Sequence, residues 1–182
     1  GLVAVFYGVR TVNRNRDWRS DEVLYTKTLA QEPDAQIIRT NLGAIYFDRG
    51  DMASAEREWM ASLGPVRPYA STLDNLGLLR SRQERYDEAI AYFQRAIAER
   101  PNYMSPHKNL AKTYVDMGRD QDAEREYRVA IDLAPLSSGA RNEFANYLLL
   151  RGRAAEAQGQ FAISAQADPN SEAQVNLGNF LT

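Results

Sequence analysis

The sequence predicts an all-α solenoid, built from antiparallel helix hairpins that stack side by side. Three observations support this fold class. Several residue types recur at intervals of 34 positions, glycines and prolines stand at two fixed places in each interval, and the composition is that of a folded chain, with 44% hydrophobic and 25% charged residues. A unit of this length holds one helix hairpin, which cannot bury its apolar stripe alone and must stack on its neighbours.

The repeat is carried by three columns of residues in register. Prolines stand at Pro33, Pro101, Pro135 and Pro169. Alanines stand 34 residues apart at Ala55, Ala89, Ala123 and Ala157. Aromatic residues keep the same step at Trp59, Phe93, Tyr127 and Phe161. The prolines are expected to follow the second helix of each unit, where a missing N–H and a steric clash stop helix growth.

A small residue in the first helix of each unit completes the pattern. The pairs are Leu42-Gly43, Leu76-Gly77, Leu110-Ala111, Phe144-Ala145 and Leu177-Gly178. The small member lets the two helices of a hairpin approach closely, with the aromatic residue of the second helix facing it. Glycines at Gly50, Gly118 and Gly152 mark the turn between the helices, and Glu84 takes the place of glycine in the remaining unit.

These columns resemble the tetratricopeptide repeat (TPR) family. The resemblance places a solenoid at residues 20–182, after an apolar and basic segment at residues 1–19. The expected full repeats are residues 36–69, 70–103, 104–137 and 138–170, with partial repeats at 20–35 and 171–182. The family implies a right-handed superhelix whose first helices line a concave groove.

One column of the first helices is expected to point into that groove. Its members are Asn41, Asn75, Asn109, Glu143 and Asn176. An amide side chain offers both a donor and an acceptor, so a row of them can bind the backbone of an extended peptide. The column resembles the asparagine ladder of protein O-GlcNAc transferases, which implies peptide binding that tolerates different sequences. The other interpretation is that these asparagines satisfy neighbouring helix groups.

Two lysines and one aromatic residue complete the expected groove. Lys108 and Lys112 lie one helical turn apart and would favour an acidic partner. They resemble part of the carboxylate clamp of chaperone-binding TPR domains, but the clamp's remaining positions fall on Glu143, Glu172 and Asn176, so we do not expect a clamp. Phe47 is expected on the groove-facing stripe as a contact for the ligand.

Composition argues against several functional classes. The chain has no cysteine and a single histidine, His107, so we expect no metal site and no cofactor. The net charge of -2 argues against a nucleic acid partner. No nucleophile with a base, phosphate loop or metal set can be assembled, which predicts a protein-binding scaffold and not an enzyme. The alternative is a structural module that forms homo-oligomers or packs on another domain of its own protein.

The amino-terminal segment leaves two interpretations open. Residues 1–9, GLVAVFYGV, are apolar and are followed by several arginines. They are too few to cross a bilayer, so they are the end of a membrane span or the apolar helix of a capping repeat. The following run TVNRNRDW, residues 11–18, resembles the junction between membrane helices and repeats in multi-pass proteins such as TPR-containing protein O-mannosyltransferases. This resemblance implies the non-catalytic repeat region of a longer, membrane-anchored protein, with the side of the membrane undecided.

Overall fold

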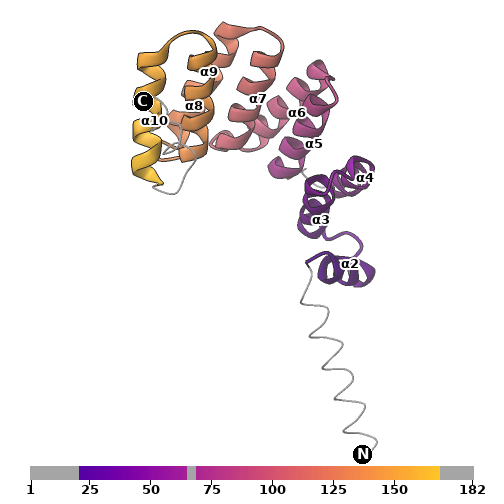
Figure 1. Ribbon diagram of the computed structural model, residues 1–182. Coiled ribbons are helices and arrows are strands. Elements are labelled where there is room, and N and C mark those ends of the chain that lie inside the picture. Colours follow the sequence, from indigo (N-terminus) through magenta and orange to yellow (C-terminus); the bar gives the residue numbers. More distant parts are fainter. Residues whose placement is uncertain (1–20, 65–68, 169–182) are drawn as a thin grey trace, which may run out of the picture.

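The computed structural model describes residues 21–64 and 69–168. These residues form helices that follow one another in antiparallel pairs and stack in a curved row (Figure 1). The helices are α2 (Asp21–Gln31), α3 (Gln36–Asp48), α4 (Met52–Ser62), α5 (Ala70–Arg82), α6 (Tyr86–Glu99), α7 (Met104–Asp116), α8 (Asp120–Leu133), α9 (Ser138–Leu150) and α10 (Ala154–Ala167). No strand occurs within these two ranges. The predicted all-α solenoid is confirmed, whereas the expectations for residues 1–19 and 171–182 lie outside the described residues.

Small residues bring the helices of each hairpin together, as the sequence predicts. A Cβ added to Gly43 would lie 2.4 Å from Nε1 of Trp59, and one added to Gly77 would lie 2.5 Å from Cε1 of Phe93. No side chain fits in that space without a shift, because real Cβ atoms do not make such contacts. In these two hairpins the aromatic ring of the second helix therefore packs directly against the glycine of the first helix.

The turn inside each hairpin has one residue in the left-handed region. Gly50, Gly118 and Gly152 have φ values of 83°, 72° and 72°, and Glu84 has a φ of 60° at the equivalent place. Glycine adopts this conformation at little steric cost, whereas a residue with a Cβ is strained by it. The hairpin of α5 and α6 has the same turn, but there the left-handed residue is Glu84, which is strained by this conformation.

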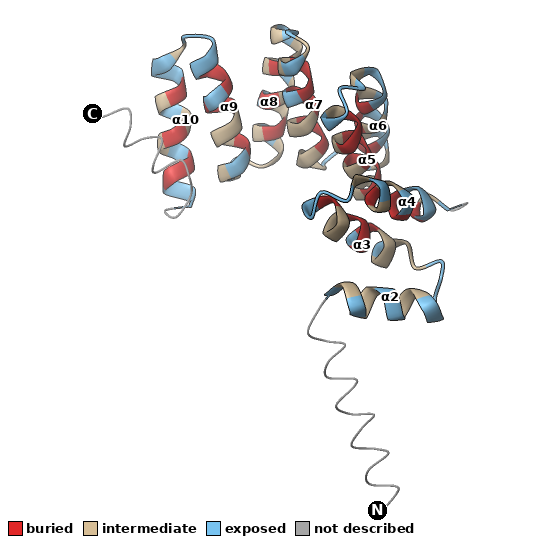
Figure 2. Ribbon diagram, turned by 45° about the vertical axis from the view of Figure 1, so that its right-hand side comes forward, coloured by how far each residue is buried: buried red, intermediate tan, exposed pale blue. Residues whose placement is uncertain are grey.

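The core divides into two clusters of buried side chains. The larger cluster runs from Ala89 and Phe93 of α6 through α7, α8 and α9 to Phe161 and Ala165 of α10. The smaller cluster lies around Trp59 and includes side chains of α3, α4 and α5. Helix α2 has no buried residue, and it is free of red in the view coloured by burial (Figure 2).

The second hairpin helix α4 differs from its counterparts. It has 11 residues, whereas α6 and α8 each have 14. Gly64 stands where those helices continue, and glycine is a poor helix former. The connection to α5 is correspondingly longer. None of the helices in the described ranges combines the length and the hydropathy that a bilayer crossing requires.

Candidate functional site

The first helices of successive hairpins form the inner side of the solenoid. The backbone of α3 approaches that of α5, and α5 approaches α7, while successive second helices do not come as close in the described part of the chain. Side-chain hydrogen bonds also join first helices, including Thr40 to Thr72 at 2.6 Å and Ser81 to Thr113 at 3.0 Å. In a curved stack the helices on the inner side lie closest together, so α3, α5 and α7 line that side. The backbones of α7 and α9 do not come as close, but the ion pair between Lys108 of α7 and Glu143 of α9 places α9 beside α7.

Each first helix carries several unburied residues at helical spacing along one stripe. On α3 the stripe is Ile37, Asn41, Ala44 and Asp48. On α5 it is Ser71, Asn75, Leu78 and Arg82. On α7 it is Ser105, Asn109, Lys112 and Asp116. On α9 it is Gly139, Glu143, Asn146 and Leu150. All of these residues are half-buried or exposed. We call this set of stripes the inner face.

The three asparagines within the described residues are not equivalent. Asn41 is exposed and Asn75 is half-buried. Neither makes a side-chain hydrogen bond to another described residue. Asn109, by contrast, donates a hydrogen bond from Nδ2 to Oδ1 of Asp74 at 2.8 Å. Two of the predicted binding amides are therefore uncommitted, and one is tied to the preceding repeat. Asn176 lies outside the described residues.

Asp74 is a buried carboxylate beside the inner face. It is 3% exposed and also accepts a hydrogen bond from Oγ of Ser105 at 2.6 Å. Burial raises the pKa of Asp74, and hydrogen bonds from Ser105 and Asn109 act in the opposite direction, as does the charge of Lys108. The carboxylate thus joins α5 to α7 and is held by donors on both of its oxygens.

The two lysines also differ in their surroundings. Lys108 donates from Nζ to Oε1 of Glu143 at 2.8 Å and so forms an ion pair between α7 and α9. Lys112 is exposed and has no ion pair with any other described residue. Glu143, which interrupts the asparagine column, therefore neutralises the charge of Lys108. Lys112 is the lysine whose charge is available to a ligand.

Phe47 belongs to the core and not to the exposed surface. It is 7% exposed, and its ring packs against that of Trp59 with centroids 5.4 Å apart. The guanidinium carbon of Arg82 lies 4.2 Å from the centroid of the Phe47 ring. This is a cation–π contact across neighbouring first helices. The exposed group at this point of the inner face is Arg82, so Phe47 is not placed as the ligand contact expected from the sequence.

His107 packs between the helices of its own hairpin. It is 8% exposed, and its Nδ1 lies 2.8 Å from Oε2 of Glu126 on α8. Within residues 21–64 and 69–168, no group of three or more His, Cys, Asp or Glu side chains is arranged to hold a metal ion.

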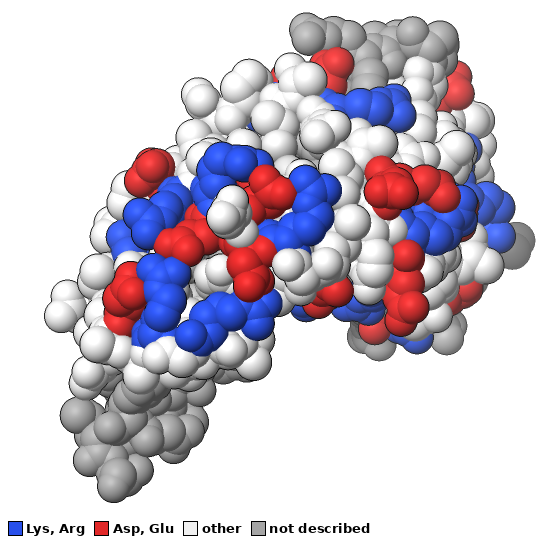
Figure 3. All heavy atoms as spheres, turned by 90° about the horizontal axis from the view of Figure 1, so that it is seen from above, with Lys and Arg blue, Asp and Glu red and all other residues white. Residues whose placement is uncertain are grey.

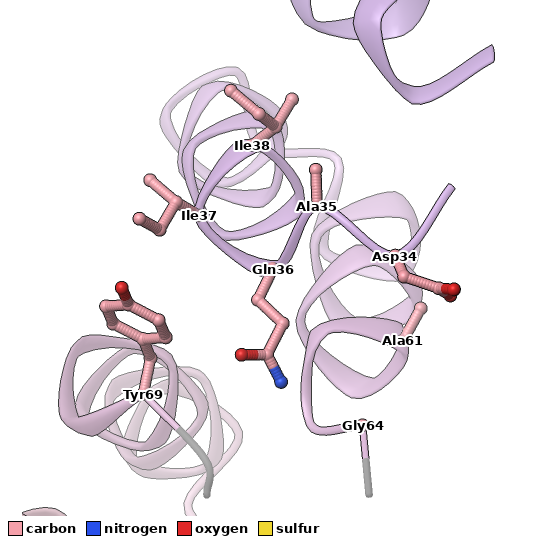
Figure 4. A pocket seen from close by; sticks show the side chains of 8 residues that line it. All are labelled: Asp34, Ala35, Gln36, Ile37, Ile38, Ala61, Gly64 and Tyr69. Atoms are coloured by element: carbon pink, nitrogen blue, oxygen red, sulfur yellow. The ribbon is translucent and has the colours of Figure 1, made fainter. Parts of the chain in front are cut away.

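An open pocket of about 780 Å³ lies next to the inner face. Its lining includes Ile37 and Gln36 of α3, Gly64 after α4, and Tyr69 before α5. Figure 4 shows the side chain of Gln36 directed between Tyr69 and Gly64. The pocket lies beside the end of α4, which has 11 residues, whereas α6 and α8 each have 14.

Another surface of the solenoid is a mixture of charges. In Figure 3, basic and acidic side chains alternate and leave no large area of one sign. Many charged side chains of the described residues form ion pairs, such as Arg153 with Glu124 at 2.7 Å and Arg80 with Glu56 at 2.5 Å. A surface paired in this way offers little net field to attract a charged ligand. The inner face is the better candidate for binding.

Two residues of this site are not identified by the sequence pattern. Asp74 and Arg82 occupy the first helix of a repeat in which Asn75 is the only predicted contact. The run Leu73-Asp74-Asn75-Leu76 does carry a signal, because an acid between two apolar positions of a helix is placed for burial. The run does not predict which residue contacts Asp74, since Asn109 lies 35 residues away in the next repeat.

Comparison with known families identifies the class of this protein. A tetratricopeptide repeat model matches residues 34–98 and 69–135, and a second tetratricopeptide repeat model matches residues 108–172. Together they cover well over half of the chain. The chain therefore belongs to the tetratricopeptide repeat family.

Among curated proteins, the chain is similar to protein O-mannosyl-transferase TMTC3 of Mus musculus, with 22% identity over 134 residues. It is also similar to protein O-mannosyl-transferase TMTC1 of Homo sapiens, with 33% identity over 89 residues. These matches cover 74% and 49% of this chain, but 11% and 10% of the two relatives. The chain thus spans about a tenth of the length of these relatives.

Solved structures share the fold. The TPR protein TTC0263 of Thermus thermophilus superposes with a TM-score of 0.79 at 20% identity, over 96% of this chain and 95% of that chain. YrrB, a TPR protein with an unusual peptide-binding site, superposes with a TM-score of 0.61 at 22% identity, over 86% of this chain and 81% of that chain. At these identities the likeness concerns the fold alone.

Proposed function

We propose that this chain is a non-catalytic protein-interaction scaffold that binds an extended polypeptide along its inner face. The observation that carries the proposal is the pair Asn41 and Asn75. Both amides lie unburied on adjacent first helices and make no side-chain hydrogen bond to another described residue. An uncommitted amide can donate to a peptide carbonyl and accept from a peptide N–H, as in other modes of backbone recognition.

The character of the inner face supports a polypeptide over a small charged ligand. The stripes mix amides, small residues and the apolar side chains of Ile37, Leu78 and Leu150. Arg82 and Lys112 supply positive charge, and Asp48 and Asp116 supply negative charge at the ends of their helices. YrrB, which has the same fold, is a TPR protein with a peptide-binding site. That property belongs to YrrB and supports the proposal by analogy.

The test uses a variant that removes the uncommitted amides. The probe is a capped twelve-residue peptide, four repeats of Ser-Thr-Ala with a fluorophore, because backbone recognition requires no particular side chains. We expect Asn41→Ala with Asn75→Ala to weaken binding about tenfold, since each neutral hydrogen bond contributes about 0.5–1.5 kcal/mol. Fluorescence anisotropy measures the affinity, and circular dichroism measures the thermal melt, which should not change.

The matched control is Gln94→Ala with Gln121→Ala, which removes two exposed amides from second helices. It should leave both affinity and melt unaltered. Equal affinity of the Asn41/Asn75 variant and the wild-type chain would contradict the proposal. Asn109 is left out of this variant because its loss also removes a donor from the buried Asp74.

We further propose that the chain is the repeat region of a longer, membrane-anchored protein. Two features support this assignment. The run at residues 11–18 resembles a junction between membrane helices and repeats, and the curated relatives named protein O-mannosyl-transferase are about ten times as long as the matched region. In such a protein the repeats would hold a polypeptide, and the chemistry would reside in another part.

A further inference from the structure

Asp74 and the amide that it contacts differ in their burial. Asp74 lies on α5 and is 3% exposed, whereas Asn109 on α7 is half-buried on the inner face. Asn109 Nδ2 lies 2.8 Å from Asp74 Oδ1, and Ser105 Oγ lies 2.6 Å from Asp74 Oδ2. Both donors come from α7, and the carboxylate receives them from beneath the surface that a ligand would touch.

The chemistry of a carboxylate decides how the amide is turned. An ionised carboxylate only accepts hydrogen bonds, so the NH₂ end of the Asn109 amide must face it. The amide is planar, and its carbonyl oxygen therefore points away from Asp74. An asparagine without such a partner can be turned either way, because its oxygen and nitrogen ends have nearly the same shape. Asn41 and Asn75 are in that second situation.

We infer that Asp74 is a positioning residue that holds the Asn109 amide with its carbonyl oxygen toward the ligand, so that this repeat accepts a hydrogen bond from a backbone N–H of the bound polypeptide. The inference rests on the proposed function and specifies one contact of it. Asn41 and Asn75 can either donate a hydrogen bond to the ligand or accept one from it, whereas Asn109 can only accept one. The bound chain therefore has a defined register at this repeat.

The surroundings of Asp74 favour a role beyond stability. A buried carboxylate loses hydration, and this loss raises the pKa of Asp74 above its usual value. The neighbouring groups that interact with it are Ser105, Asn109, Lys108 and the hydroxyl of Tyr103. Lys108 is in turn paired with Glu143. An uncharged amide of the same shape would avoid the loss of hydration, so stability alone does not call for a carboxylate here.

The first experiment needs no ligand. In protein labelled with ¹⁵N at asparagine, the side-chain NH₂ of Asn109 should resonate downfield of those of Asn41 and Asn75, because it donates to a charged acceptor. Asp74→Asn should move this signal toward the other two and should leave the thermal melt equal or higher. Ser105→Ala is the matched control, since it keeps both Asp74 and Asn109. An Asn109 signal that is unchanged in Asp74→Asn would overturn the inference.

The second experiment measures the polarity of the contact with the capped Ser-Thr-Ala peptide. Each backbone N–H is replaced in turn by an ester oxygen. At the position that lies on Asn109, the ester should lower affinity about fivefold for the wild-type chain and for Ser105→Ala. The penalty should vanish in Asn109→Ala and shrink in Asp74→Asn, because the released amide can then turn its NH₂ end toward the ester oxygen. The double variant should show no penalty, as in Asn109→Ala alone. An undiminished penalty in Asp74→Asn would overturn the inference.

The two experiments separate the inference from the proposed function. A wild-type chain that does not bind the peptide at all contradicts the proposed function, and the Asn109 resonance still decides whether Asp74 orients the amide. A chain that binds the peptide but shows the same ester penalty with and without Asp74 keeps the proposed function and loses the inference.

Discussion

At the scale of single residues, Glu84 shows how the repeat tolerates an exception. The turns of three hairpins use glycine in the left-handed region, and Glu84 adopts the same conformation with a φ of 60°. Its side chain is exposed and makes no ion pair with another described residue. Backbone hydrogen bonds from Glu84 N to Ser81 O at 3.0 Å and from Arg85 N to Arg80 O at 2.9 Å hold the turn in this conformation.

We therefore expect Glu84→Gly to stabilise the chain by about 0.5–1 kcal/mol, because relief of the left-handed strain outweighs the added flexibility of glycine in the unfolded chain. Urea unfolding followed by circular dichroism measures the change. The matched control is Gly118→Ala, which introduces the same strain at the next hairpin and should destabilise by a similar amount. A less stable Glu84→Gly variant would show that the Glu84 side chain has a structural role.

At the scale of helices, ion pairs join one hairpin to the next. Glu124 of α8 accepts hydrogen bonds from Arg153 at the start of α10, at 2.7 and 3.1 Å, and from Arg128 on its own helix at 2.6 Å. The hydrogen bond from Arg153 lowers the pKa of Glu124 below its usual 4.5. A carboxylate with a lowered pKa stabilises the fold while it is ionised.

The sign of this effect predicts acid sensitivity at the junction between α8 and α10. The stabilisation is complete above the unfolded pKa of 4.5 and is lost as the pH falls through that value to the lower folded pKa. Glu124→Gln should cost about 1 kcal/mol or less at pH 7, and the cost should shrink as the pH falls toward 3. Thermal melts from pH 7 to pH 3 measure the difference. Asp132→Asn, which changes an exposed carboxylate on the same helix, is the matched control and should leave the melt at pH 7 unaltered.

At the scale of the whole molecule, stability is unevenly distributed along the solenoid. The larger core cluster spans α6 to α10, and the smaller cluster holds α3, α4 and α5. Helix α2 buries no residue, and α4 stops early beside an open pocket. Repeat proteins gain stability from each hairpin and from its interfaces with neighbours. A weak interface therefore lowers the stability of the hairpins beside it more than that of distant ones.

Hydrogen exchange should follow this distribution. We expect the backbone amides of α2, α3 and α4 to exchange at least about tenfold faster than those of α7 and α8, because they open without disturbing the larger cluster. Exchange measured by mass spectrometry on the native chain reports it helix by helix. Uniform protection across all the hairpins would instead indicate a single cooperative unit.

Much of this architecture follows from the sequence because the decisive contacts are local. The pairing of Gly77 with Phe93 is readable from two columns that lie 16 residues apart in one hairpin. The site is less readable. Asn41 and Asn75 are unburied and Asn109 is tied to Asp74, a difference that the sequence pattern does not reveal, and the pattern also treats Lys108 and Lys112 alike.

The period, the order of the helices, the small residues that contact aromatic rings and the family all follow from the order of residues along the chain. These features depend on contacts within one hairpin, where spacing along the chain sets spacing in space. Three other contacts are visible only in the folded chain: Asp74 accepts a hydrogen bond from Asn109, Glu143 pairs with Lys108, and Phe47 is buried beneath Arg82. Those contacts cross from one repeat to the next, so they depend on how far each hairpin is rotated against its neighbour and on which rotamers that rotation allows.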